Sequence, residues 1–176
     1  AVDFASARGG GIVYFPRGTY YVSDTIKLRS NVNIEGEYKQ SKIISTLIGV
    51  FVHEDSSDVD NVLIKNITFG STYSSTTQTY GFVTVGEGSG KSTNIVCEGL
   101  TNEGGEGGLG VRFGPNAAHC RAIDCEFTDL QMDGARLVGC VDVKVFRSRF
   151  LRNRWGVFCA DEANNCVIAN CDFWRN

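Results

Sequence analysis

The sequence predicts an all-β protein built as a parallel β-helix, a solenoid of short strands in which each turn stacks on the turn before it. The first observation is a regular repeat near the C-terminus, whose three segments close at equal intervals on Phe127, Phe150 and Phe173. The second is that small or apolar residues alternate with polar residues inside each segment, the pattern of strands with one buried face. Because a fixed repeat returns like residues to like positions, the segments are expected to stack as successive turns.

Earlier in the chain the same pattern recurs with wider spacing. One aligned apolar position passes through six turns at sequence intervals of 30, 33, 25, 23 and 23; its members are Ile34, Ile64, Cys97, Ala122, Val145 and Ile168. Two residues later the alternation changes phase, which predicts a bend. The bend position holds Gly36, Asn66, Gly99, Asp124, Arg147 and Asn170. Gly, Asn and Asp tolerate a positive φ, so the bend is expected to use that conformation, with arginine as the exception.

The chain is expected to form one domain over residues 1–176, of about six coils. Its four parts are a capping-helix remnant at 1–11, the first coils at 12–60, wide coils with glycine-rich loops at 61–118, and regular 23-residue coils at 119–176. The glycines at 9–11 supply the stop that a helix C-terminus favours. The last turn would leave a set of unpaired strand edges, so the sequence is expected to be a fragment of a longer protein or to be covered by another chain or domain.

Seven cysteines suggest a disulfide framework, but their positions in the repeat argue against one. Cys120 and Cys166 share one column two turns apart, a separation of about 9 to 10 Å. A disulfide needs Cα atoms within about 7 Å of each other. The same argument separates Cys125 from Cys171, so these four are expected to be small buried hydrophobes. The argument constrains the other three less: Cys97, Cys140 and Cys159.

Composition and spacing exclude several classes of function. The formal net charge of −3 argues against a nucleic-acid-binding surface, which would be basic. There is no run of eighteen apolar residues and no signal peptide, so no membrane segment is expected. His53 and His119 lack metal-ligand spacing and are expected to be hydrogen-bonded turn residues. The sequence predicts neither a metal site nor a cofactor.

Residues 9–37 carry a more specific pattern, GGGIVYFPRGTYYVSDTIKLRSNVNIEGE. A glycine-rich turn after a helix and a strand ending in Phe-Pro-x-Gly-x-Tyr resemble the first segment of the pectate-lyase-like superfamily of right-handed parallel β-helices. The resemblance is to the branch that contains bacteriophage tailspikes and exopolysaccharide-degrading enzymes. The later regular coils resemble the general repeat of that superfamily. These motifs specify the fold strongly and the chemistry poorly.

The resemblance implies a protein that binds long polysaccharides in a groove and cleaves them by hydrolysis or β-elimination. It also implies a homotrimer in the extracellular space or on a virion surface. None of the superfamily's catalytic motifs is recognisable in the sequence, so whether the chain is an enzyme stays open. An enzyme would be a polysaccharide lyase or a glycoside hydrolase. The alternative is a non-catalytic β-helix, a structural or adhesin segment of a fibre.

Several acidic residues have a structural explanation. Three of them precede arginines by one full repeat, which places each acid directly under a base; the pairs are Asp124 with Arg147, Glu126 with Arg149, and Asp129 with Arg152. Opposite charges in such positions contribute roughly 0.2 to 1 kcal/mol each. Asp172 returns one turn above Arg149 and extends the series. A charge ladder is therefore favoured over catalysis for these residues.

The remaining polar residues suggest a carbohydrate site. Glycoside hydrolysis needs two carboxylates, and neighbouring turns can supply them. Asp133, Asp161 and Glu162 are the candidate catalytic residues, and Arg154 and Trp155 are the candidate substrate-binding residues, with the indole available to stack on a sugar ring. Trp155 is expected one turn above Asp133.

The same residues also have a purely structural interpretation. Asp133 and Gly134 can form a turn, Trp155 can pack against it, and the acids at 161–162 can form a solvated loop. A carbohydrate enzyme predicts two unpaired carboxylates in a groove beside an exposed aromatic residue. The structural interpretation predicts that every carboxylate is paired or solvated.

Overall fold

The structure, a computed structural model, describes residues 1–46, 49–53, 55–72, 81–103 and 108–176. The sequence also predicts a serine- and threonine-rich excursion or polar strand at 71–80 and a glycine-rich surface loop at 102–110, and these segments fall largely or partly outside the described residues. A short helix, α1 (Val2–Ser6), precedes the first strand. It ends before Gly9, whose φ of 88° provides the left-handed stop that the sequence predicts.

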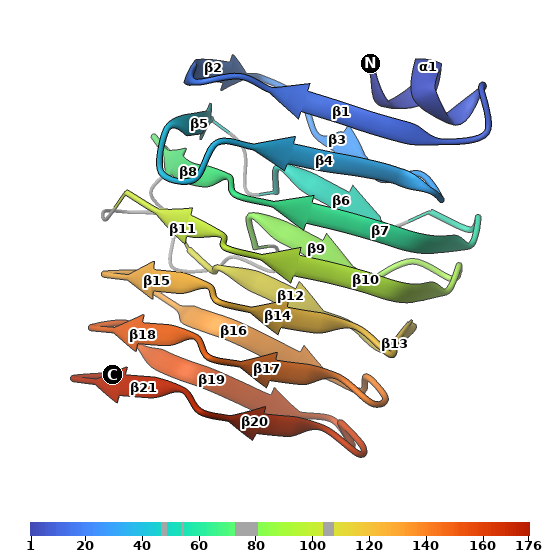
Figure 1. The fold of residues 1–176 in the computed structure, drawn as a ribbon. Coiled ribbons are helices and arrows are strands. Elements are labelled where there is room, and N and C mark those ends of the chain that lie inside the picture. The colour runs from blue at the N-terminus through green and yellow to red at the C-terminus, as the bar shows by residue number, and fades with distance from the viewer. Residues whose placement is uncertain (47–48, 54, 73–80, 104–107) are drawn as a thin grey trace.

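All other elements form a right-handed parallel β-helix of about six turns, as predicted (Figure 1). Each turn contributes one strand to each of three parallel sheets, except that the last turn contributes β20 and β21 to the first two sheets only. Sheet A contains β1 (Gly11–Phe15), β4 (Val32–Gly36), β7 (Val59–Lys65), β10 (Ser92–Glu98), β14 (Arg121–Ile123), β17 (Lys144–Phe146) and β20 (Val167–Ala169), with β13 (Ala117–Ala118) paired to β10.

The other two sheets complete the three-sided coil. Sheet B contains β2 (Gly18–Val22), β5 (Ser41–Ser45), β8 (Thr68–Ser71), β11 (Thr101–Asn102), β15 (Glu126–Thr128), β18 (Arg149–Leu151) and β21 (Asp172–Trp174). Sheet C contains β3 (Ile26–Lys27), β6 (Phe51–His53), β9 (Val83–Val85), β12 (Val111–Phe113), β16 (Asp133–Val138) and β19 (Trp155–Ala160). Within a turn the chain runs from sheet A to sheet B to sheet C.

The predicted register is confirmed at every turn. The strand partners are Ile34 with Ile64, Ile64 with Cys97, Cys97 with Ala122, Ala122 with Val145, and Val145 with Ile168. In sheet B, Phe127 pairs with Phe150 and Phe150 with Phe173. The length of each turn therefore follows from the sequence alone.

The bend between sheets A and B uses a positive φ at five of its six positions. Asn66, Gly99, Asp124, Arg147 and Asn170 all have φ between 48° and 61°. Arginine thus adopts the same conformation as the residues better suited to it, because the stacked turns on either side impose the bend.

Gly36 departs from the prediction, because it ends β4 without a positive φ. Its glycine has a different cause: an added Cβ would lie 2.8 Å from the backbone oxygen of Asn66. Close approach of the next turn therefore explains this position.

Stacked aromatic rings form the part of the core beneath sheet B. The rings of Phe127 and Phe150 are 6.4 Å apart, and those of Phe150 and Phe173 are 5.4 Å apart. Each ring packs against a glycine in or beside a strand of sheet C; an added Cβ on Gly134 would lie 2.2 Å from Phe150 Cδ1. In successive turns the repeat therefore packs a phenylalanine ring against a glycine, which has no side chain to occupy the same space.

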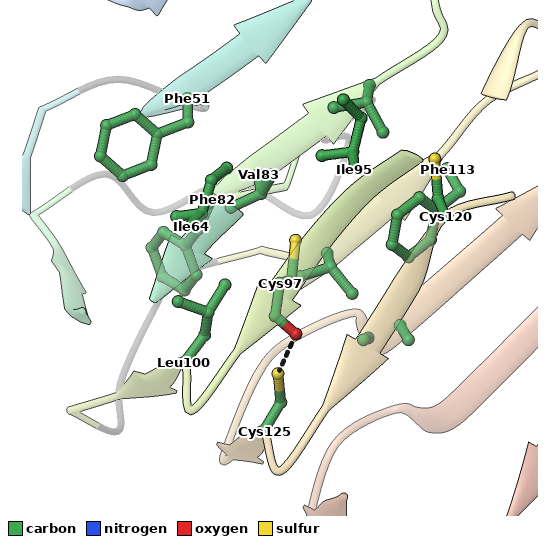
Figure 2. Close-up of a cluster of buried hydrophobic side chains, with 14 of the residues drawn as sticks. Phe51, Ile64, Phe82, Val83, Ile95, Cys97, Leu100, Phe113, Cys120 and Cys125 are labelled. Carbon is green, nitrogen blue, oxygen red and sulfur yellow. Dashed lines mark hydrogen bonds between the residues drawn. The ribbon is translucent and has the colours of Figure 1, made fainter. Parts of the chain in front are cut away.

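Cysteines fill much of the remaining core, and all seven are free thiols. Cys97, Cys120 and Cys125 are buried among aliphatic and aromatic side chains, and Cys125 Sγ lies 3.6 Å from the carbonyl oxygen of Cys97 (Figure 2). The prediction of small buried hydrophobes is confirmed for Cys120 and Cys125. Cys166 and Cys171, in the last turn, are only partly buried.

Asparagines support the turn between sheets B and C. Asn153 is buried; its Oδ1 accepts a hydrogen bond from the Leu130 N–H at 3.0 Å, and its Nδ2 donates to the Phe127 carbonyl at 3.0 Å. Asn176, one repeat later, donates from Nδ2 to the Phe150 carbonyl at 2.7 Å. These side chains satisfy backbone groups that the strand ladders leave open.

The predicted charge ladder is present on the outer surface of sheet B and its bends. Its ion pairs are Arg147–Asp124 at 2.8 Å, Arg149–Glu126 at 3.3 Å, Arg152–Asp129 at 2.6 Å and Arg149–Asp172 at 3.9 Å.

Among the described residues, no helix is long and apolar enough to cross a membrane.

Candidate functional site

The predicted carbohydrate patch begins at the corner between sheets B and C. Thr128 ends β15, and β16 begins five residues later at Asp133. Asp133 pairs with Trp155 at the start of β19, as the sequence predicts. The segment at 133–134 is therefore strand rather than the turn that the structural interpretation expected.

Asp133 is a buried carboxyl group with one free oxygen. The residue is 0% exposed, and its Oδ2 accepts a hydrogen bond from Arg136 Nε at 2.5 Å. Its Oδ1 has no hydrogen-bond partner among the described residues. Burial raises the pKa of Asp133, and the hydrogen bond from Arg136 opposes that shift. A carboxyl group of this kind can hold a proton more readily than an exposed aspartate.

Trp155 presents an exposed indole beside this acid. The residue is 39% exposed, and its ring lies 5.0 Å from the ring of Phe158. The guanidinium of Arg154 lies 4.3 Å from the indole centroid, within range of a cation–π contact. An aromatic face next to a cation is a suitable surface for a sugar ring that carries polar substituents.

Two further arginines lie in sheet C near the patch; Arg112 is buried and Arg136 is largely covered. Arg112 pairs with Arg136, and Arg136 pairs with Phe158, in successive strands. Arg112 donates to both carboxylate oxygens of Glu87, at 2.7 and 3.2 Å. The sequence analysis missed these residues, although their separation by about one repeat in the sequence is a usable signal.

The other two predicted acids lie elsewhere. Asp161 and Glu162 follow the last residue of β19, whereas Trp155 is its first residue. Six residues of extended chain place Asp161 roughly 20 Å from Trp155. Paired carboxylates in glycosidases are at most about 9.5 Å apart. Asp133 therefore cannot form a catalytic pair with Asp161 or Glu162.

A second group of acids, which the sequence analysis did not connect, lines a pocket on sheet B. The pocket has a volume of about 140 Å³ and lies over β8, β11 and β15; its lining residues are Lys39, Thr68, Thr101, Asn102, Glu103 and Glu126. Glu126 belongs to the predicted ladder, but its Oε2 also lies 3.6 Å from Lys39 Nζ. Glu103 forms an ion pair with Lys42.

The floor of this pocket is polar and buried. Thr68 and Thr101 are neighbours in the sheet and are almost fully buried, and their hydroxyl oxygens are 2.9 Å apart. Asn102 holds the next turn by accepting from the Thr128 N–H and donating to the Thr128 carbonyl, each at 2.8 Å. These bonds fix the backbone from which Glu103 projects.

Strand geometry sets the separation of the two glutamates. Thr101 pairs with Glu126, and Glu103 is two residues further along the same strand direction. With strands about 4.8 Å apart and about 3.3 Å per residue, the two Cα atoms are about 8 Å apart. Both side chains point outward into one pocket, so their carboxylates lie within reach of the separations used in glycoside hydrolysis.

Both histidines are hydrogen-bonded, as predicted, but His53 ends strand β6 and does not lie in a turn. His53 is buried, with Nδ1 2.6 Å from Ser92 Oγ and Nε2 2.7 Å from the Ser57 carbonyl. His119 Nδ1 lies 2.7 Å from Asp142 Oδ2. No cluster of three or more potential metal ligands occurs among the described residues.

Comparisons with known proteins address the fold. Residues 1–49 match the family model of rhamnogalacturonase A/epimerase, pectate lyase-like. This is the part of the chain that carries the helix, the glycine-rich turn and the Phe-Pro-x-Gly-x-Tyr strand. No curated protein matches the sequence.

Solved structures match over most of the chain. A tailspike protein mutant of E. coli bacteriophage HK620 in complex with a pentasaccharide is 23% identical over 85% of this chain, with a TM-score of 0.69. The catalytic unit of a GH87 α-1,3-glucanase from Streptomyces thermodiastaticus is 19% identical over 97% of this chain, with a TM-score of 0.77. The matches cover 30% and 31% of those chains, so this chain spans about a third of their length.

The strand register, the three sheets and the similarity to these solved structures all indicate the same fold. The chain has a right-handed parallel β-helix fold, and its residues 1–49 are similar to the pectate lyase-like family model.

Proposed function

We propose that this chain binds a polysaccharide across its outer surface and cleaves a glycosidic bond at the pocket lined by Glu103 and Glu126. The observation that carries the proposal is a polar pocket with carboxylates from two neighbouring turns. Both carboxylates are ion-paired, which differs from the unpaired acids that the sequence analysis expected of an enzyme. One carboxyl group would protonate the leaving oxygen, and the other would activate water or attack the sugar directly. Lys39 and Lys42 hold the two side chains in place from an earlier turn.

The patch at the corner of sheets B and C supplies the binding surface. Trp155 would stack on a sugar ring, and Arg154 would contact its polar substituents. Asp133 lies beneath them, and its Oδ1 has no hydrogen-bond partner among the described residues. We retain Asp133 as a candidate acid of this surface; Asp161 and Glu162 would contact only a glycan that extends along β19.

The similar proteins support a carbohydrate substrate. A tailspike bound to a pentasaccharide and an α-1,3-glucanase share the fold, and the family model that matches residues 1–49 is that of rhamnogalacturonase A/epimerase, pectate lyase-like. We infer that the chain acts in the extracellular space or on a virion surface, and the resemblance to tailspikes implies a homotrimer. Light scattering of the purified chain tests the assembly; a monomer at every concentration would contradict it.

Activity is tested with α-1,3-glucan, rhamnogalacturonan and polygalacturonate as substrates. Release of reducing ends measures cleavage, and ultraviolet absorbance of an unsaturated product separates a lyase from a hydrolase. Glu103→Gln keeps the side-chain shape and is expected to reduce the rate by about 10² to 10⁴, the contribution typical of general acid–base catalysis. Glu98→Gln is the matched control, because Glu98 also pairs with a lysine, Lys65, but on sheet A.

Binding is tested separately from cleavage. Trp155→Ala is expected to weaken polysaccharide binding about tenfold, as truncation of a central aromatic contact does. Tyr21→Ala removes an exposed ring on β2, far from the patch, and is expected to leave binding unchanged. Binding without cleavage in the unaltered chain would favour the non-catalytic alternative, and neither binding nor cleavage would refute the proposed function.

A further inference from the structure

Two of the free thiols are in direct contact across neighbouring turns. Cys140 follows β16, and Cys166 precedes β20 in the next turn. Their Sγ atoms are 3.8 Å apart. Cys140 is fully buried, and Cys166 is partly buried against the same core.

The backbone around this contact is held in register. The Asn164 N–H donates to the Cys140 carbonyl at 2.8 Å, and Val141 forms a parallel bridge with Asn164. Cys166 is only two residues beyond Asn164. A disulfide has an S–S length of about 2.05 Å, so the sulfurs need to approach by about 1.8 Å while the turns keep their pairing.

The other core thiols have different surroundings. Cys120, Cys125 and Cys171 each place Sγ 3.6 Å from a backbone carbonyl of the preceding turn. Cys166 has a backbone carbonyl of its own turn, that of Asn164, at 3.4 Å, but toward the preceding turn it meets the sulfur of Cys140. Cys166 therefore differs from these three cysteines, because its sulfur contacts a sulfur of the preceding turn where theirs contact a backbone carbonyl.

The spacing argument that separates Cys120 from Cys166 does not exclude a disulfide between Cys140 and Cys166. That argument concerned cysteines in one column two turns apart, and Cys140 stands three residues before the column that contains Val143 and Cys166. The chain folds at the corner between sheets C and A, which brings the two side chains together from adjacent turns. This contact is independent of the proposed carbohydrate site.

We propose that Cys140 and Cys166 form a disulfide when the chain meets a small disulfide oxidant such as oxidised glutathione. The thiolate of Cys166, the more exposed of the two, attacks the oxidant and releases one glutathione thiol. The Cys140 thiolate then attacks the Cys166 sulfur of the mixed disulfide and releases the second. Two protons and two electrons leave the protein, the oxidant is reduced to two thiols, and one S–S bond joins the last two turns.

The test uses the purified, fully reduced chain treated with oxidised glutathione. Intact mass should fall by two hydrogen atoms, and a non-reducing peptide map should contain a peptide that joins Cys140 to Cys166. Closing a loop of this length should raise the melting temperature by about 5 to 10 °C. Addition of a thiol reductant should reverse both changes.

Single substitutions identify the partners. Cys159→Ser should retain the cross-link and the shift in melting temperature, because the exposed Cys159 is not one of the pair. Cys166→Ser should abolish both, and its reduced form should fold like the reduced parent chain. A map that joins Cys159 to Cys166, or one that contains only glutathione adducts or free thiols, would overturn the proposal.

Discussion

The wide turns and the regular turns differ in the charges they place in one outward-facing column of sheet B. This column runs through Lys42, Thr68, Thr101, Glu126, Arg149 and Asp172. In the regular turns its charges alternate, and each acid is neutralised by a base above or below it. In the wider turns the column is uncharged at Thr68 and Thr101, and a pocket opens there.

The difference shows how a repeat restricts function. When successive turns have the same length, residues at the same repeat position lie directly above one another. Opposite charges at that position can then pair in every turn. A turn of another length changes what lies beside the column, and Glu103 then stands next to Glu126 with no equivalent in the regular turns. Glu126 lies at the boundary and belongs to both arrangements. The following predictions test this contrast in descending order of the effect we expect.

Catalysis should depend on Glu126 because of the pocket and not because of the ladder. Glu126→Gln is expected to lower the rate of polysaccharide cleavage by about 10² to 10⁴. Asp124→Asn removes a carboxylate whose ion pair, among the described residues, is with Arg147 of the ladder, and it should retain the parent rate. Reducing-end assays on both variants make the comparison, and equal losses would refute the distinction between pocket and ladder.

Core stacking should contribute most where the turns are regular and covered. Phe150→Ala is expected to lower the free energy of unfolding by about 3 to 5 kcal/mol, because it leaves a cavity between two stacked rings. Phe173→Ala truncates the last ring of the stack, which is 51% exposed, and should cost clearly less. Urea denaturation of the two variants measures this order, and a larger loss for Phe173→Ala would contradict it.

The buried asparagine of the regular turns should contribute more to stability than a comparable asparagine of the first coils. Asn153→Ala leaves the Leu130 N–H and the Phe127 carbonyl without their partners and should cost about 1 to 3 kcal/mol. Asn33→Ala removes one bond, which Leu63 N–H donates to Asn33 Oδ1 at 3.0 Å in a less buried position. Its cost should be smaller. Chemical denaturation distinguishes the two, and no loss for Asn153→Ala would count against its role in the turn.

The pKa values of an acid in the charge ladder, Asp124, and of the buried acid Asp133 should also differ. The hydrogen bond from Arg147 lowers the pKa of Asp124, so the stability from this pair is present above the unfolded pKa and is lost as the pH falls through the folded one. Burial raises the pKa of Asp133, so its ionisation disfavours the fold as the pH rises from the unfolded pKa to the folded pKa. Carboxyl NMR should therefore record Asp133 titrating at the higher pH. The opposite order would refute the assigned environments.

Much of the fold is a consequence of local sequence pattern. Alternation, repeat length and the residues of the bend define each strand by its neighbours one turn away, so one alignment predicts the sheet A pairs from Ile34 to Ile168 and the stacked phenylalanines of sheet B. The charge ladder follows from the same alignment, because residues at one spacing must stack. The exposed Trp155 above Asp133 was predictable for the same reason.

The pocket and the thiol contact depended on the tertiary structure. Glu103 and Lys42 come from turns of different length, so no single spacing relates them, and lateral neighbours on a sheet leave no periodic signal. Cys140 and Cys166 meet across a corner, where the path of the chain and not its period sets the distance. Residues that lie above one another could thus be read from the chain alone, because stacking follows the repeat. Residues that lie side by side needed the folded molecule, because lateral contacts follow the shape of each turn.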